Sequence, residues 1–210
     1  MPRSAPDPVL PACLMARQDE SADALFYAAP RLVTHVDDAT IAALTDVYRE
    51  FVPAGSRVLD LQSSWVSHLP DEVAYAHVAG QGMNALELQQ NPRLGQQVVQ
   101  DLNQEPELPF DDETFDVALN AFSMQYLVRP VEVLQSVRRV LRPGGVHLVA
   151  LSHRMFPTKA IAVWPVLEMA DRACWVGVYF RLAGGWSEPA LLDRSPVGAD
   201  PLWVVLAHRA

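Results

Sequence analysis

Short apolar segments alternate with helical segments between residues 57 and 152, and this rhythm constrains the fold more than any other feature of the sequence. Strands are expected at "RVLDL" (57–61), "AYAHVAG" (74–80), "QQVVQDL" (96–102), "TFDVALNAFS" (114–123) and "VHLVALS" (146–152). Apolar strands separated by helices are typical of a parallel sheet covered on both faces. The pattern predicts a doubly wound α/β fold.

The segments on either side of this region extend the prediction. "DDATIAALTDVYREFV" (37–52) has helical spacing and an aspartate cap signal, and a second helix is expected over 130–141 before "RPGG". A long helical zone over 158–185 is interrupted at Pro165. After it, 186–195 and 201–209 fit an antiparallel hairpin at the sheet edge. Residues 1–36 are loop-rich, so we expect an N-terminal extension followed by one domain over 37–210.

Composition narrows the classes of protein. The chain has 210 residues and a net charge of −9, which disfavours a nucleic-acid partner. No apolar run approaches the roughly 20 residues that span a bilayer, and the proline-rich start does not resemble a signal peptide, so a cytoplasmic location without membrane association is expected. Cys13 and Cys174 are expected to be free thiols, and no metal-ligand spacing is present.

Residues 108–156, "LPFDDETFDVALNAFSMQYLVRPVEVLQSVRRVLRPGGVHLVALSHRMF", carry a resemblance to a known family. They are similar to the approach to strand four, the following helix and the "VL-x-PGG" turn of class I S-adenosylmethionine-dependent methyltransferases, in the small-molecule, methyltransferase type 11-like branch. The resemblance extends over about 40–210. It implies a mostly parallel, Rossmann-like sheet of seven strands, with an antiparallel C-terminal strand and helices on both faces, and S-adenosylmethionine as cofactor.

The cofactor loop departs from the family pattern. After strand one the family has D-x-G-x-G-x-G, and the matching positions here are Asp60, Gln62, Ser64 and Val66. Only the acid is retained, whereas glycine normally lets the backbone approach the ligand closely. The acid that binds the ribose hydroxyls after strand two is matched by Gly82, so it is lost as well. The resemblance therefore predicts weakened cofactor binding.

Other positions after the strands are expected to compensate or to keep their roles. In an open parallel sheet these positions face the ligand. Ser63, Ser64 and Asn84 have polar side chains that can replace lost contacts. The resemblance assigns the remaining cofactor contacts to Met83 beside the ribose position, to Asp101 and Leu102 beside the adenine, and to Asn120 and Ala121 beside the methionine moiety.

Acceptor contacts are expected after strands four and five and in the N-terminal extension. Gln125 and Tyr126 follow strand four and can hold or deprotonate an acceptor, although core packing explains Tyr126 equally well. His153 after strand five suits general-base catalysis, and Arg154 would favour an anionic acceptor.

Tyr27, Arg31 and His35 lie at four-residue spacing, so one helical face can present them as a lid over the acceptor; a solvated surface is the alternative. His68, on an expected short helical turn, is interpreted as structural rather than as a base. Trp65 either lines the pocket or covers the sheet.

Three functions are compared. The first is methyl transfer from S-adenosylmethionine to a small molecule, and the second is a methyltransferase-like binding or regulatory module whose pocket is filled by Gln62 and Val66. The third, a nicotinamide-dependent oxidoreductase, requires a glycine-rich turn after strand one and an acid after strand two, and the sequence has neither. Fold alone does not separate the first two. Oligomeric state is not encoded in any pattern that we identify.

Overall fold

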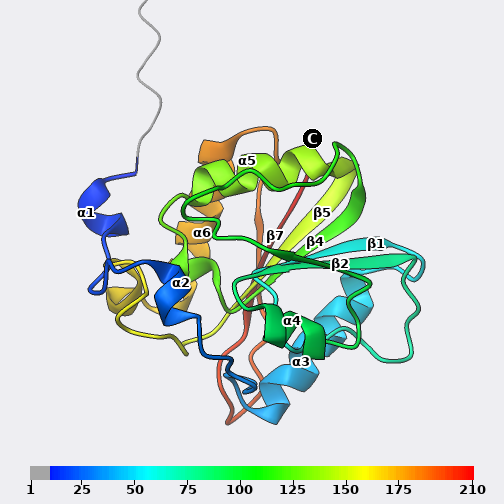
Figure 1. Cartoon of the computed structure of the whole chain (residues 1–210), viewed down its shortest axis with the longest axis horizontal. Helices are drawn as coiled ribbons and strands as arrows, with labels where there is room; N and C mark the ends of the chain where they lie inside the picture. Colours follow the sequence, from blue (N-terminus) through cyan, green and yellow to red (C-terminus); the bar gives the residue numbers. More distant parts are fainter. Residues whose placement is uncertain (1–9) are drawn as a thin grey trace, which may run out of the picture.

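The computed structural model describes residues 10–210 and contains one seven-stranded sheet with the order β3-β2-β1-β4-β5-β7-β6 (Figure 1). Its elements, in chain order, are α1 (Ala12–Met15), α2 (Asp23–Phe26), α3 (Asp38–Phe51), β1 (Arg57–Leu61), β2 (His77–Gly82), α4 (Ala85–Gln90), β3 (Gln96–Val99), β4 (Phe115–Ala121), the 3-10 helix η1 (Met124–Tyr126), α5 (Pro130–Val140), β5 (Leu141–Leu151), the 3-10 helix η2 (Trp164–Val166), α6 (Met169–Ala183), β6 (Ala190–Asp193) and β7 (Trp203–His208).

Strand direction confirms the predicted topology. The neighbours β3, β2, β1, β4 and β5 pair in parallel. The C-terminal strand β7 pairs antiparallel with β5, with Leu148 opposite Leu206, and β6 completes the hairpin at the edge. The strand order reverses between β1 and β4, which is where an open α/β sheet forms a crevice at the carboxyl ends of its strands.

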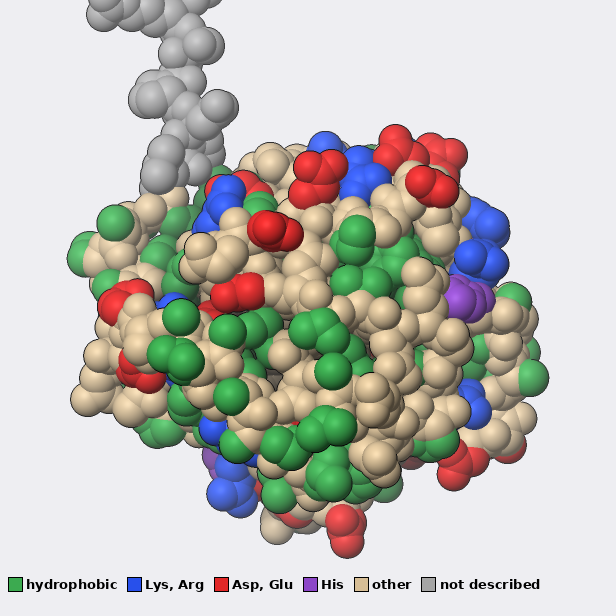
Figure 2. Space-filling view, in the orientation of Figure 1, with side chains coloured by type: hydrophobic (Ala, Val, Ile, Leu, Met, Phe, Trp, Pro, Cys, Tyr) green, Lys and Arg blue, Asp and Glu red, His purple; other side chains and the backbone are tan. Residues whose placement is uncertain are grey.

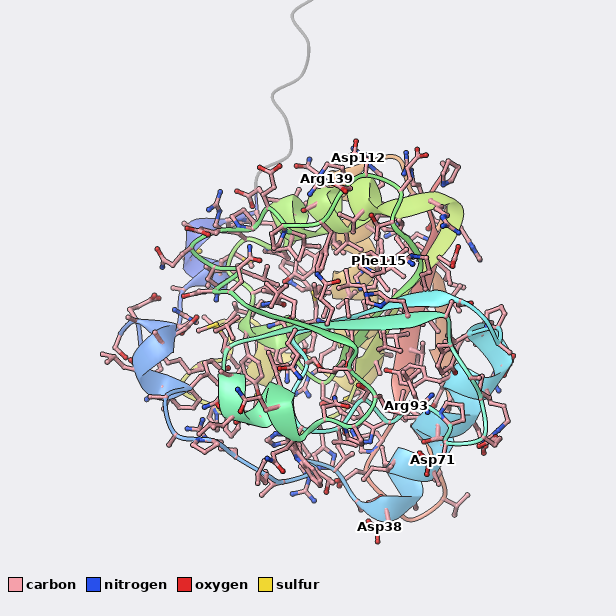
Figure 3. All side chains as sticks on the ribbon, turned by 45° about the vertical axis from the view of Figure 1, so that its right-hand side comes forward. Asp38, Asp71, Arg93, Asp112, Phe115 and Arg139 are labelled. Carbon is pink, nitrogen blue, oxygen red and sulfur yellow. The ribbon has the colours of Figure 1, made fainter. Side chains whose placement is uncertain are left out.

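Helices cover both faces of the sheet because successive strand side chains point to opposite faces. In β1, Val58 packs in a cluster with Leu44 and Tyr48 of α3, whereas Leu59 packs in the cluster that contains the buried faces of α5 and α6. Figure 3 shows Asp38, at the start of α3, and Arg139 of α5 on opposite sides of the molecule. The prediction of helices on both faces is confirmed.

Element boundaries differ from the sequence prediction in several strands. β5 begins at Leu141 rather than 146, so it includes the "RPGG" segment that was expected to precede it. β2 differs at its start. This strand begins at His77 rather than 74, because the connection from β1 crosses the sheet as an irregular loop over 62–76 without a helix. The short helical turn expected around His68 is therefore wrong. In the zone 158–185, only residues from Met169 onward form an α-helix, which ends at Gly184 with φ of 66°.

Cys13 and Cys174 are both free and exposed. None of the helices in residues 10–210 is long and apolar enough to cross a membrane, and within the same range no cluster of three or more histidine, cysteine, aspartate or glutamate side chains could hold a metal ion.

Candidate active site at the carboxyl ends of the strands

A cavity of about 260 Å³ lies at the carboxyl ends of the central strands. Its floor comes from the residues after β1, β2, β3 and β4, and part of its wall comes from Asp23 to His35. Figure 2 shows a hollow on this face, between α2 and α4 in the orientation of Figure 1. The predicted cofactor residues that line it are Asp60, Gln62, Ser63, Ser64, Met83, Asn84, Asp101, Leu102 and Ala121; Gly82 and Asn120 lie behind this lining.

Asp60 ends β1 as a buried carboxylate without a cationic partner among the described residues. Burial raises its pKa to about 6, although the hydroxyls of Ser63 and Ser67 both donate to its Oδ2 atom over 2.6 Å. Desolvation disfavours an isolated buried charge unless an opposite charge is present. The cavity thus contains an acid that a cationic ligand would stabilise.

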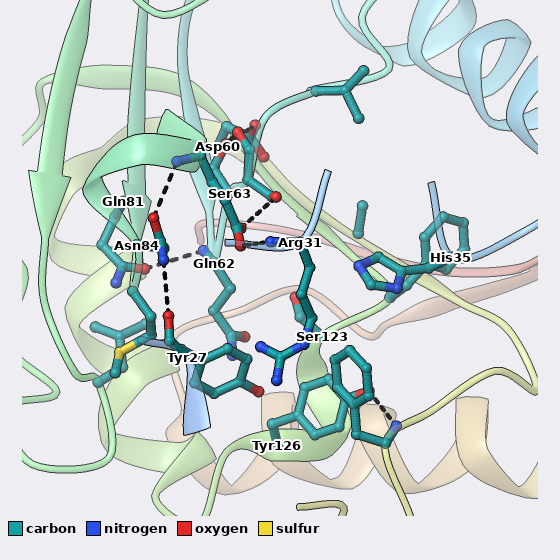
Figure 4. Close-up of a pocket in the computed structure, with 18 of the residues that line it drawn as sticks. Tyr27, Arg31, His35, Asp60, Gln62, Ser63, Gln81, Asn84, Ser123 and Tyr126 are labelled. Atoms are coloured by element: carbon teal, nitrogen blue, oxygen red, sulfur yellow. Dashed lines mark hydrogen bonds between the residues drawn. The ribbon is translucent and has the colours of Figure 1, made fainter. Parts of the chain in front are cut away.

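Gln62 occupies the place of the first glycine and lines the cavity. Its Oε1 atom accepts a hydrogen bond from Asn120 Nδ2 over 2.8 Å, which joins the ends of β1 and β4. Its backbone N–H donates to Gln81 Oε1, and Gln81 donates in turn to the carbonyl of Gln100 (Figure 4). These side-chain bonds hold the loop in place of the usual glycine turn.

Gly82 is required by close backbone contact. A Cβ atom at this position would lie 2.3 Å from the carbonyl oxygen of Ser63, because the loop after β1 folds over the end of β2. The backbone N–H of Ser63 also donates to the carbonyl of Gln81 over 2.7 Å. An aspartate therefore cannot be accommodated at residue 82 in this arrangement. The loss of the acid that binds the ribose is thus a consequence of the altered conformation of the loop after β1.

The polar residues expected to compensate already have partners within the protein. Asn84 Oδ1 caps α4 by accepting from the N–H groups of Leu86 and Glu87, and its Nδ2 atom donates to the carbonyl of Tyr27 over 2.9 Å. The Ser64 hydroxyl donates to Glu87 over 2.6 Å. Sequence analysis missed Glu87, which lines the cavity from the first turn of α4. No local sequence pattern marks Glu87 as a site residue, because the family acid is expected at residue 82 and not in the helix that follows.

Backbone conformations of high energy are concentrated around the cavity. Five non-glycine residues among the described residues have positive φ, and four of them line it: His35, Gln62, His68 and Phe122. Such conformations cost a non-glycine residue roughly 1–2 kcal/mol. Strained residues that persist together are typical of functional sites, where the surrounding structure imposes their geometry.

Aromatic side chains form the side of the cavity opposite Asp60. Tyr126 stacks on Phe156, with ring centroids 5.8 Å apart, and its hydroxyl accepts from the backbone N–H of Phe156 over 2.9 Å. Burial raises the pKa of Tyr126 and also that of Tyr27, so neither phenol is ionised near neutral pH. Tyr126 therefore combines the two alternatives considered from the sequence, because it packs on the core and also lines the cavity.

Two histidines line the cavity in neutral form. Burial lowers the pKa of His68 to about 4, and nearby His35 lowers it further. Burial likewise lowers the pKa of His35. His68 packs edge-on against Phe122 at the end of β4. The structure thus brings His68, which the sequence placed in a structural role, to the end of β4.

The other residues proposed after β4 and β5 point elsewhere. His153 Nε2 lies 3.2 Å from Asp200 Oδ1, and His153 is not part of the cavity lining. Arg154 reaches the rim of the cavity, but its guanidinium pairs with the same Asp200 over 2.9 Å. Gln125 is buried and donates to the carbonyl of Phe122. We therefore do not retain His153 and Gln125 as catalytic residues.

The N-terminal segment covers the cavity without forming the expected helical face. Tyr27 ends the short helix α2, and Arg31 and His35 lie in irregular backbone, yet all three line the cavity. Trp65 does not line it; its Nε1 atom donates to the carbonyl of Val33 over 3.0 Å and so ties the β1 loop to this segment.

A buried ion cluster that the sequence did not reveal anchors the same segment. Asp23 accepts from Arg17 over 2.8 Å, from Asn103 over 2.8 Å, and lies 3.2 Å from Lys159. Burial opposes ionisation of Asp23, but the donors outweigh it and lower its pKa. The Lys159 side chain is fully buried. Asn103 and Lys159 are distant in sequence from Arg17 and Asp23, so no local pattern indicates the cluster.

Comparison with known proteins agrees with the geometry. Residues 66–149 match the family described as "Methyltransferase domain". This part of the chain is similar to methyltransferase domains. The match begins at Val66, the last of the three positions at which the glycines of the family pattern are absent.

Curated relatives match shorter parts of the chain. A ubiquinone/menaquinone biosynthesis C-methyltransferase of Roseobacter denitrificans is 44% identical over 54 residues, which is 26% of this chain and 21% of the relative. A demethylmenaquinone methyltransferase of Clavibacter sepedonicus is 34% identical over 98 residues, covering 44% of this chain and 39% of the relative. The matches thus span between about a fifth and two fifths of these relatives' lengths.

Solved structures establish the fold. An S-adenosylmethionine-dependent methyltransferase from Aquifex aeolicus superposes with a TM-score of 0.57 at 18% identity, over 83% of this chain and 99% of that one. A second, from Mesorhizobium loti, has a TM-score of 0.57 at 16% identity, over 80% and 98% of the two chains. The predicted Rossmann-like methyltransferase fold is confirmed.

Proposed function

We propose that the protein transfers a methyl group from S-adenosylmethionine to a small-molecule acceptor. The observation that carries the proposal is Asp60, a buried acid without a countercharge at the switch point of a methyltransferase fold. S-adenosylmethionine has a sulfonium and an ammonium group, so it offers the positive charge that this acid lacks. The match of residues 66–149 to methyltransferase domains supports the same activity.

The side chains present fit this cofactor in an altered form. Asp60 would hold the cationic amino-acid part, and Asp101, which lines the cavity after β3, would accept from the adenine amine. Glu87 would replace the acid lost at Gly82. Its two oxygens each accept one bond, from Ser64 and from the N–H of Arg31, and a carboxylate has about four acceptor sites, which leaves room for ribose hydroxyls.

Binding requires local opening. The cavity of about 260 Å³ lies just below the roughly 300–1,000 Å³ typical of ligand pockets, and the Gln62–Asn120 bond occupies part of its floor. We expect Gln62 or the segment over 23–35 to move when ligand enters. This cost leads us to expect a dissociation constant in the micromolar range or above.

Bound cofactor supplies an electrophilic methyl group, so the protein contributes mainly positioning. Phe156, Tyr126 and Tyr27 would orient an acceptor and exclude water from it. If the acceptor must lose a proton, the neutral imidazole of His68 is the group placed to take it, since it lines the cavity at the end of β4 and is uncharged at neutral pH.

A methyltransferase-like binding module is the second candidate. The observation that favours it is the refilled loop, in which Ser63 O contacts Gly82 and Gln62 bonds Asn120. In this case the cavity would bind a different ligand or a partner. Asp60 would then only accept the hydrogen bonds from Ser63 and Ser67 that hold the loop.

Titration calorimetry with S-adenosylhomocysteine, at pH 7.5, separates the candidates. Micromolar to submillimolar binding that Asp60→Asn weakens about tenfold or more would support the enzyme, since a hydrogen bond to a charged group contributes about 1.5–3 kcal/mol. Asp116→Asn is the matched control, because Asp116 lies in β4 outside the cavity lining. Absence of binding at millimolar ligand by the wild type would favour the module.

A further inference from the structure

Positive charge in the cavity is limited to two arginines, and they differ in their partners. Arg154 at the rim is paired with Asp200 over 2.9 and 3.0 Å. Arg31 forms no ion pair with any carboxylate among residues 10–210, and its Nη1 atom is buried without a hydrogen-bond partner in that range. Because arginine is always protonated, this nitrogen is a charged donor left open.

The rest of Arg31 is fixed in place. Its backbone N–H donates to Glu87 over 2.7 Å, and its Nη2 atom donates to the carbonyl of Phe26 over 2.9 Å. The guanidinium carbon lies 4.4 Å from the ring centroid of Phe26 and 5.2 Å from that of Phe156. A guanidinium that packs against two rings loses little freedom when it binds an anion, since its planar fork is already oriented.

The position of Arg31 in the cavity indicates which part of a ligand it meets. Figure 4 shows its guanidinium near the rings of Tyr27 and Tyr126, on the aromatic side of the cavity and across from Asp60. The acids Asp60 and Glu87 lie on the side to which we assign the cofactor. An anion at Arg31 would therefore be attached to an apolar or aromatic body that packs against Tyr27, Tyr126 and Phe156, which line the cavity.

We propose that Arg31 selects an acceptor that carries a carboxylate on an aromatic or similarly flat apolar body. The inference rests on the proposed function, because an acceptor presupposes methyl transfer. The preference for a carboxylate does not itself require bound cofactor. It also replaces Arg154, the residue that the sequence analysis associated with an anionic acceptor, because Asp200 already neutralises Arg154.

The test uses a matched pair of probes, cinnamate and its neutral amide cinnamamide, with binding to the 210-residue protein followed by calorimetry. Wild type should bind cinnamate at least about tenfold more tightly than cinnamamide, the factor expected from one hydrogen bond to a charged group. Arg31→Met should abolish this preference, and Arg31→Lys should retain part of it because the charge remains without the fork.

Arg93→Met is the matched control. Arg93 also stacks on an aromatic ring, with its guanidinium carbon 5.3 Å from the centroid of Tyr75, and also donates to a backbone carbonyl, that of Val73. It lies outside the cavity lining, at the position labelled in Figure 3. This variant should keep the full preference for cinnamate. Circular dichroism melts of all variants establish that each is folded.

Two results would overturn the proposal. One is a wild-type protein that does not discriminate between the probes. The other is an Arg31→Met variant whose preference for cinnamate is unchanged. If that variant also binds S-adenosylhomocysteine tenfold more weakly, but binds 5′-methylthioadenosine, which lacks the amino-acid part, as tightly as wild type, Arg31 is assigned to the cofactor carboxylate. Failure of S-adenosylhomocysteine to bind the wild type would instead refute the proposed function and leave the probe comparison valid.

Discussion

The side-chain amide of Asn120 donates to Gln62 Oε1 over 2.8 Å and connects the end of β4 to the end of β1. Both residues lie where the strand order of the sheet reverses. In this protein a pair of amide side chains therefore occupies the floor of the crevice in which such folds bind their ligands. Gln62 has φ of 52°, so the loop keeps a backbone conformation suited to glycine without having the glycine.

Gln62→Gly should tighten the binding of S-adenosylhomocysteine by up to about tenfold. The ligand would no longer have to displace the Gln62–Asn120 bond, and a neutral hydrogen bond contributes about 0.5–1.5 kcal/mol. The free energy of unfolding should stay within about 1 kcal/mol of wild type, because relief of the positive φ offsets the lost bond. Calorimetry and urea unfolding measure the two quantities.

Glu113→Gly is the control for this change. Glu113 also has positive φ, at 56°, but it lies on an exposed loop outside the cavity. This variant should leave binding unaltered. Weaker binding by Gln62→Gly would show instead that the glutamine side chain is itself a ligand contact.

The sheet could be predicted from the sequence because each strand carries its own signal. Two local patterns correspond to the buried clusters of the structure. One is the alternation of Val58 and Leu59 between the two faces of the sheet, and the other is the helical spacing of Leu44, Val47 and Tyr48. The antiparallel position of β7 followed from the family resemblance. Sequence reasoning was least accurate at residues 62–76, where no periodic pattern exists and the backbone is held by side-chain bonds.

The site was predicted only in outline because its details depend on contacts between distant residues. The carboxyl ends of parallel strands necessarily meet, so Asp60 and Asp101 could be placed at the cavity. By contrast, the need for glycine at residue 82 depends on the position of the Ser63 carbonyl oxygen. His153 lies outside the cavity lining and contacts Asp200, which is 47 residues further along the chain. Neither relationship has a local sequence signature.

Asp60 should make stability depend on pH in a defined direction. Its pKa is raised to about 6 in the folded state from about 3.8, so the folded protein binds more protons across this window and stability falls as the pH rises through it. About two pKa units at 1.36 kcal/mol each correspond to roughly 3 kcal/mol at most. Asp60→Asn, which keeps an oxygen acceptor for Ser63 and Ser67, should therefore gain stability over wild type at pH 7 but not at pH 4.

Urea unfolding of both proteins at these two pH values measures the difference, and the contributions of other groups cancel. A constant difference between the two proteins would show that Asp60 already has a countercharge. Saturating S-adenosylhomocysteine, whose ammonium would supply that charge, should reduce the pH dependence.

His147 should show the opposite dependence. Its ring is fully buried in β5 beside Phe180 and Trp186, neither ring nitrogen has a hydrogen-bond partner among the described residues, and burial lowers its pKa to about 3. The unfolded chain then binds more protons between about pH 6.5 and 3, so stability is lost as the pH falls through this window. His147→Leu should stabilise the protein by about 1–3 kcal/mol at pH 7, since it removes an unsatisfied polar group, and by more at pH 5.

Thermal and urea unfolding at the two pH values measure this gain. His208→Leu is the control, because His208 is exposed at the end of β7 and donates or accepts only at the surface. A destabilised His147→Leu variant would indicate that the imidazole has a partner, such as water, that compensates its burial.

Asp23 should control how firmly the N-terminal segment is held over the cavity. We expect residues 10–36 to exchange their amide hydrogens faster than β4, because this segment has only short helices. Asp23→Ala should accelerate this exchange further, by about 100-fold or more, since it leaves the buried Lys159 and Arg17 side chains without their main partner, and breaking a buried pair costs about 3–5 kcal/mol.

Hydrogen exchange followed by mass spectrometry measures the effect by segment, and Glu20→Ala is the control. Glu20 belongs to the same segment and accepts a hydrogen bond from the backbone N–H of Arg17 over 2.6 Å. Its side chain is 60% exposed and its Oε2 atom lies 3.9 Å from Arg17 Nε, so its removal should change exchange little. If Asp23→Ala accelerates exchange in β4 as strongly as in residues 10–36, the cluster stabilises the whole domain rather than the cover of the cavity. If it changes neither, Asp19, which lies 3.3 Å from Lys159, is sufficient to hold the segment.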